Sequence, residues 1–114
     1  MRESFILTNF VTDVKVDSRE VAKGTATTLT CIVFDLTEKA VIKWFLEALE
    51  LESSDDYSIT GDDHIDSEGS QTSKLTIHNP TESTVFNCQV SSILYSNSAS
   101  SETFAHLYVY GSSL

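Results

Sequence analysis

The chain has 114 residues, of which 17 are acidic and 7 are basic, so its formal net charge is −10. This length allows one domain with one core, and a hydrophobic content of 40% is typical of a folded chain. The acidic balance argues against nucleic-acid binding, which requires a basic surface, and against electrostatic contact with an anionic membrane. No apolar run is long enough to be a membrane span.

Short runs in which apolar and polar residues alternate follow one another along the chain, which is typical of half-buried β-strands. Glycine at position 24 suits a turn because it adopts positive φ at no steric cost, and Asn79-Pro80 is expected to start another turn. Residues 47–54 have helix propensity but also alternate, and we interpret them as a short edge strand. The other predicted strands are residues 5–17, 27–33, 40–47, 57–61, 70–77, 85–94 and 102–110.

The alternation predicts which side chains form the core, because residues two apart on a strand share a face. Cys31 and Cys88 both fall on the apolar side of their strands. Two cysteines allow one intramolecular bridge, which persists in an oxidising compartment; the alternative is a reduced pair buried in a cytosolic protein. The predicted core comprises Leu29, Trp44, Leu75, Ile77, Phe86 and Leu107.

Four short motifs follow one another along the chain. They are V-x-x-G-x-x-x-x-L-x-C from Val21 to Cys31, Trp44-Phe45, L-T-I from Leu75 to Ile77, and F-x-C from Phe86 to Cys88. In this order they resemble the immunoglobulin superfamily. The resemblance implies an all-β, two-sheet antiparallel immunoglobulin-like Greek-key sandwich over residues 14–110, with one inter-sheet disulfide between Cys31 and Cys88 and the Trp44 indole packed on it. Residues 1–13 are then a leading edge strand or linker remnant, and residues 111–114 a tail.

Departures from the superfamily pattern indicate the subtype. Phe86 stands where the family usually has a corner tyrosine, and Glu82 stands in place of the corner aspartate. The last strand lacks the G-x-G bulge of antigen-receptor domains. The chain therefore resembles an I-set, C2-like or short V-like module, similar to ectodomain modules of invertebrate adhesion and recognition receptors.

An apolar and aromatic patch is predicted on the outward side of the sheet that holds Trp44, Cys88 and the last strand. Such patches with polar rims often mark interfaces. The resemblance implies a protein partner, either another copy of the chain or a different protein. The alternative is that these side chains are scattered on the surface or covered by a neighbouring domain. The predicted partner-binding residues are Phe45, Ile93, His106, Tyr108 and Tyr110.

The sequence predicts neither an enzyme nor a cofactor. No nucleophile-elbow or zinc-protease motif organises its serine and histidine residues. The weak metal candidate is an acidic stretch with Asp62, Asp63, Asp66 and Glu68, because calcium prefers several carboxylate oxygens from a flexible loop. Ser67 stands where the EF-hand loop needs glycine, so we favour a solvated acidic surface that protects an edge strand from aggregation.

These features predict an extracellular module from a cell-surface adhesion or recognition receptor. The first residues, MRESFIL, lack the apolar core of a secretion signal, so we expect a piece of a longer secreted or membrane-anchored protein. Two alternatives remain. One is a secreted innate-defence molecule that binds microbial surfaces, with calcium at the acidic stretch. The other is a spacer domain that only positions its neighbours.

Overall fold

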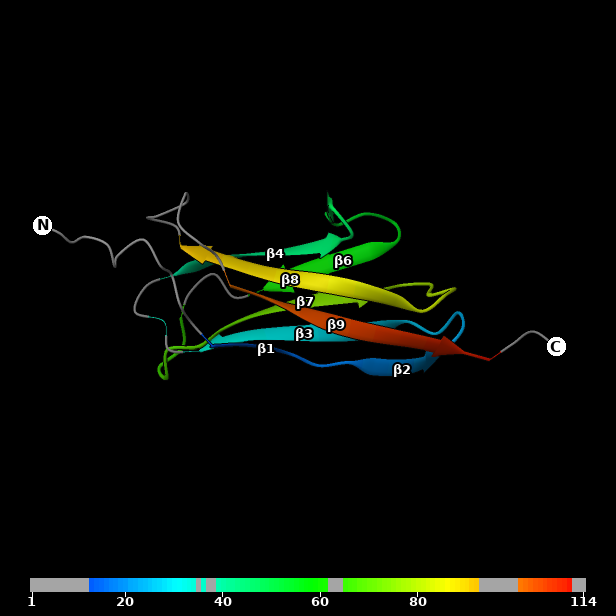
Figure 1. Ribbon diagram of the computed structural model, residues 1–114, viewed down its shortest axis with the longest axis horizontal. Coiled ribbons are helices and arrows are strands. Elements are labelled where there is room, and N and C mark those ends of the chain that lie inside the picture. Colours follow the sequence, from blue (N-terminus) through cyan, green and yellow to red (C-terminus); the bar gives the residue numbers. More distant parts are fainter. Residues whose placement is uncertain (1–12, 35, 37–38, 62–64, 93–100, 112–114) are drawn as a thin grey trace, which may run out of the picture.

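The computed structural model describes residues 13–34, 36, 39–61, 65–92 and 101–111, which form two packed β-sheets (Figure 1). One sheet has four strands in the order β1-β3-β7-β6, and the other has five in the order β2-β9-β8-β4-β5. The predicted all-β sandwich is confirmed. The strands are β1 (Asp13–Val16), β2 (Arg19–Ala22), β3 (Thr27–Phe34), β4 (Ala40–Leu46), β5 (Leu49–Glu50), β6 (Tyr57–Gly61), β7 (Gln71–Ile77), β8 (Thr84–Ser92) and β9 (Ser101–Tyr110).

The first strands are divided between the two sheets, which the sequence did not predict. β1 pairs with β3 in antiparallel fashion, whereas β2 pairs with β9 in parallel. The Asp17 carboxylate accepts the Thr30 N–H at 2.8 Å, and the Ser18 hydroxyl accepts the His106 N–H at 3.1 Å. Asp17 therefore hydrogen-bonds to the four-stranded sheet, and Ser18, the next residue, hydrogen-bonds to the five-stranded sheet. Residues 5–12 of the predicted first strand lie outside the described residues.

The core fills the space between the sheets. All six residues expected there are at most 6% exposed. Leu36 and Leu51, from segments between strands, add to the core at 8% and 6% exposure. Neither lies in a strand of the structure. The predicted edge strand over residues 47–54 is reduced to Leu49–Glu50, and Leu49, which alternation groups with Leu51, is 65% exposed. The core residues predicted from the sequence are Leu29, Trp44, Leu75, Ile77, Phe86 and Leu107.

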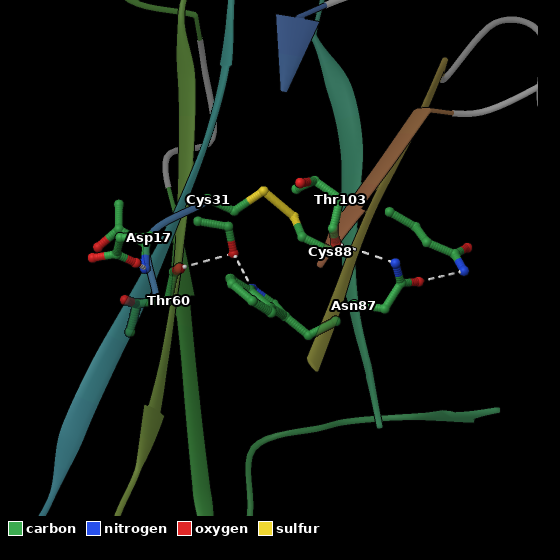
Figure 2. Close-up of a disulfide and its surroundings, with 10 residues drawn as sticks. Asp17, Cys31, Thr60, Asn87, Cys88 and Thr103 are labelled. Carbon is green, nitrogen blue, oxygen red and sulfur yellow. Dashed lines mark hydrogen bonds between the residues drawn. A yellow bond between two sulfur atoms is a disulfide. The ribbon is translucent and has the colours of Figure 1, made fainter. Parts of the chain in front are cut away.

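The two sheets are linked twice at one level. Cys31 in β3 and Cys88 in β8 form the disulfide, which crosses between the sheets (Figure 2). Their cross-strand neighbours are Ser73 and Trp44, and the Trp44 Nε1–H donates to the Ser73 hydroxyl at 3.0 Å. That hydroxyl donates in turn to the Thr60 carbonyl at 3.3 Å. The buried indole N–H therefore has a partner, as a buried donor requires.

A second polar link closes the free edge of β4. The buried Gln71 amide in β7 accepts the Ala40 N–H and donates to the Ala40 carbonyl, both at 2.9 Å. Strand β5, which would cover this edge, has only two residues. Residues 51–56, between β5 and β6, form no strand, so the sheet lacks the full additional strand pair of a variable-type domain.

Phe86 fills the position of the corner tyrosine and packs against Tyr57 from the opposite sheet. Their rings meet edge to face, with centroids 6.1 Å apart and an interplanar angle of 78°. Burial raises the pKa of the Tyr57 phenol, and the neighbouring Asp56 carboxylate raises it further. Both effects disfavour the phenolate, so this contact between the sheets is made by a neutral ring.

Candidate partner-binding face

The outward sides of the two sheets differ in chemistry. The outward side of the four-stranded sheet presents hydroxyl groups from β3, β7 and β6, and the Thr28 and Thr76 hydroxyls hydrogen-bond to each other at 2.8 Å. Ile32 and Phe34 on this side are half-buried, and the Lys15 ammonium lies 5.8 Å from the centroid of the Phe34 ring. The five-stranded sheet presents aromatic and apolar side chains from β4, β8 and β9. We call this second surface the aromatic face and define it by Phe45, Val85, Asn87, Phe104, His106 and Tyr108.

The structure places the predicted partner-binding residues as follows. Phe45 is half-buried on β4. His106, Tyr108 and Tyr110 are exposed on β9, with exposed fractions of 52% for Tyr108 and 57% for Tyr110. Ile93 lies outside the described residues. Three of the five residues are therefore accessible on a single strand.

Two exposed apolar residues on the aromatic face were missed. Phe104 is 54% exposed and Val85 is 44% exposed. The signal was present, because Phe104 precedes His106 by two residues and so falls on the same side of β9. Val85 is likewise two residues from Asn87 on β8, and it pairs directly with His106.

Asn87 lies at the centre of the face, flanked by Phe45 on β4 and Phe104 on β9. Although it is on the outward side, its side chain is only 6% exposed. The amide donates to the Thr103 carbonyl at 3.2 Å and accepts from the Gln89 amide at 2.7 Å (Figure 2). These bonds satisfy its polar atoms, so the amide is a fixed platform between the two rings.

The accessible end of β9 is held by serine hydroxyls. The His106 and Tyr108 rings stack with centroids 6.0 Å apart and an interplanar angle of 11°. The Ser83 hydroxyl accepts the Val109 N–H at 2.9 Å, and the Ser18 hydroxyl accepts that of His106. Because the strand is anchored on both sides of the stack, its rings are presented from a rigid backbone.

A shallow groove of about 550 Å³ continues the aromatic face toward the β4–β5 turn. Glu47, in that turn, has φ of 58°, the left-handed region that a non-glycine residue seldom occupies. Glu82, from the segment before β8, lies on the other wall. The groove is lined by Leu46, Glu47, Glu82, Ser83, Thr84, Val85, His106, Leu107 and Tyr108.

The candidate metal residues are only partly described. Asp62 and Asp63 lie outside the described residues. The Asp66 carboxylate accepts the N–H groups of Glu68 and Ser70 at 2.8 and 2.9 Å, which makes it part of a turn. Within the described part of the chain, no group of three or more metal-ligating side chains lies close enough together to hold a metal ion.

Among the residues that the structure describes, no helix is long and apolar enough to cross a membrane.

A sequence profile of the immunoglobulin domain matches residues 17–101, in agreement with the two-sheet fold and its inter-sheet disulfide. The chain belongs to the immunoglobulin domain family. Its strand set, with a two-residue β5, fits the I-set or C2-like description. The matched range contains both cysteines and half of the residues of the aromatic face, but ends before Phe104, His106 and Tyr108.

Solved structures with the same fold include several parts of titin. An I-band fragment matches with a TM-score of 0.64 and 22% identity, over 87% of this chain and 31% of the fragment. The M1 domain from titin matches with a TM-score of 0.66 and 19% identity, over 89% of this chain and 96% of that domain. Titin kinase with its flanking domains gives a TM-score of 0.59 and 19% identity, over 85% and 17% of the two chains.

The chain thus spans less than a third of the I-band fragment that it matches. No curated protein matches the sequence significantly. At these identities the structural likeness shows the fold alone.

Proposed function

We propose that this domain is an extracellular adhesion or recognition module that binds a protein partner through the aromatic face. The observation that carries the proposal is the contrast between the two sheets. Exposed Phe104 and Tyr108 lie on one outward side, whereas the other bears a threonine-rich surface. Aromatic residues are enriched in the cores of protein interfaces, and exposed aromatic patches on a rigid sheet are candidates for contact.

The hydrogen bonds that fix the aromatic face support a binding function over the alternative of aromatic side chains scattered on the surface. The Asn87 side chain both donates and accepts a hydrogen bond, and the Ser18 and Ser83 hydroxyls accept the His106 and Val109 N–H groups of β9. A preorganised face loses little conformational entropy when a partner covers it.

An extracellular location is proposed on the basis of the Cys31–Cys88 disulfide. Disulfides form and persist in oxidising compartments and are rare in the cytosol of mesophiles. An adhesion module also belongs to a secreted or membrane-anchored protein. The domain serves as a binding scaffold in this proposal and performs no catalysis.

The proposal is tested with fluorescent tetramers of the domain, applied to arrays of secreted and cell-surface proteins. We expect the double variant Phe104→Ser/Tyr108→Ser to bind at least about tenfold more weakly than wild type, because aromatic residues contribute most at interface hot spots. The matched control is Thr28→Ser/Thr76→Ser, which changes the opposite face and keeps its hydroxyl pair.

Circular dichroism of each variant establishes that it is folded. Equal binding by the wild type and the Phe104/Tyr108 variant would remove this face from the proposal. Absence of any bound protein would favour the spacer function, and binding to microbial surfaces alone would favour the innate-defence function.

A further inference from the structure

We infer that the groove beside the aromatic face accepts a cationic side chain, arginine or lysine, from a protein other than a second copy of this chain. The inference rests on the proposed function and specifies the partner. It decides between the two kinds of partner that the sequence left open. The evidence lies in the charges, rings and apolar floor of the groove.

The charged groups in the groove are unbalanced. Glu47 and Glu82 line it, and none of its lining residues is lysine or arginine. The ion pairs in the described part of the chain lie elsewhere, between Arg19 and Asp17 and between Lys43 and Glu50. Within the part of the chain that the structure describes, neither Glu47 nor Glu82 forms an ion pair, so both carboxylates are available to a positive group from a partner.

The remaining walls suit the rest of such a side chain. Tyr108 is 52% exposed and borders the groove, and the part of its ring that is not stacked on His106 can contact a cation. Leu46 and Val85 provide apolar surface for the aliphatic stem. A volume of about 550 Å³ accommodates a complete arginine or lysine side chain together with adjacent backbone.

A second copy of the chain is the wrong occupant on electrostatic grounds. A symmetric contact places the same patch on both sides. Glu47 and Glu82 would then face the same two glutamates, in a molecule whose formal net charge is already −10. Like charges brought together at an interface are unfavourable, and the groove contains no lysine or arginine to offset them.

The test titrates the ¹⁵N-labelled domain with an end-blocked peptide of alternating arginine and leucine, followed by NMR. We expect saturable shifts of the amides of Val85, His106 and Tyr108. The same peptide with citrulline in place of arginine has nearly the same shape but no charge, and should not saturate the same amides. Added salt should weaken binding of the arginine peptide, because partly exposed charges are screened.

Variants assign the effect to the groove. Glu47→Gln/Glu82→Gln should weaken binding of the arginine peptide about fivefold, as expected from two partly exposed ion pairs. The control Asp55→Asn/Glu68→Gln makes the same change in net charge at exposed sites outside the groove, and should retain affinity within about twofold. Loss of binding equally in both variants would show only a non-specific response to net charge and would overturn the inference.

Two further results would also overturn it: equal binding of the citrulline peptide, or sedimentation of the free domain as a dimer that Glu47→Gln/Glu82→Gln strengthens. If the arginine peptide fails but tetramer binding still depends on Phe104 and Tyr108, this inference is wrong and the proposed function stands. If neither holds, both are wrong.

Discussion

At the scale of single residues, the buried polar side chains are the least predictable part of the fold. Trp44 was expected in the core from its place among alternating residues, but its partner Ser73 was not. A serine is common on surfaces and in turns, so nothing local indicates that its hydroxyl accepts a buried indole N–H. Ser73 lies 29 residues away from Trp44 in the chain, and only the packing of the two sheets brings the two side chains together.

Tyr57 gives the fold a specific response to alkaline pH. Because its pKa is raised in the folded state, the folded protein holds its phenolic proton more strongly than the unfolded chain does. The resulting stabilisation is complete below the ordinary tyrosine pKa and is lost as pH rises through the higher folded-state value.

Urea unfolding measured across this alkaline range should therefore show a steeper loss of stability for wild type than for Tyr57→Phe. The phenylalanine variant keeps the edge-to-face contact with Phe86 and removes the titrating group. Tyr110→Phe, at a position that is 57% exposed, removes a phenolic hydroxyl outside the Tyr57–Phe86 contact and is the matched control. Identical slopes for wild type and Tyr57→Phe would contradict this interpretation.

At the scale of strands, alternation predicted most elements but not how each edge is completed. Alternation also indicated which residues of β9 point outward on the aromatic face, although Phe104 was overlooked two residues before the predicted His106. β2 was missed because its four residues have one fully buried side chain and pair with β9, more than eighty residues later. The Gln71–Ala40 contact was missed because the sequence around a polar residue at an inward position does not indicate which group it will hydrogen-bond.

The Gln71 contact can be tested by removing its hydrogen bonds while keeping its length. Gln71→Met should lower the free energy of unfolding by about 2–4 kcal/mol, because it leaves the buried N–H and carbonyl of Ala40 unpaired. Lys74→Met, at an exposed outward position of the same strand, should change it by no more than about 0.5 kcal/mol. Chemical denaturation measures the free energy of unfolding of each variant. Equal changes in the two variants would show that the hydrogen bonds from the Gln71 amide do not stabilise the edge of β4.

At the scale of the whole molecule, one level of the sandwich unites the two sheets by a covalent bond and an adjacent hydrogen bond. The disulfide joins residues 57 apart, which in the chain-entropy estimate stabilises the fold by about 4 kcal/mol. The order of cysteine, tryptophan and cysteine along the chain predicted the disulfide and the buried indole, but not the hydrogen bond to Ser73. Asn87, at the centre of the aromatic face, is adjacent to Cys88 in β8.

The disulfide also carries the proposal that the domain works outside the cytosol, so its redox state is the most direct test. The protein, produced through an oxidising secretory route, is unfolded without reductant, treated with iodoacetamide and weighed by mass spectrometry. We predict no alkylated cysteine before reduction and two after it. Two alkylated cysteines in the unreduced protein would show that Cys31 and Cys88 remain thiols, and would contradict both the cross-linked sandwich and its extracellular assignment.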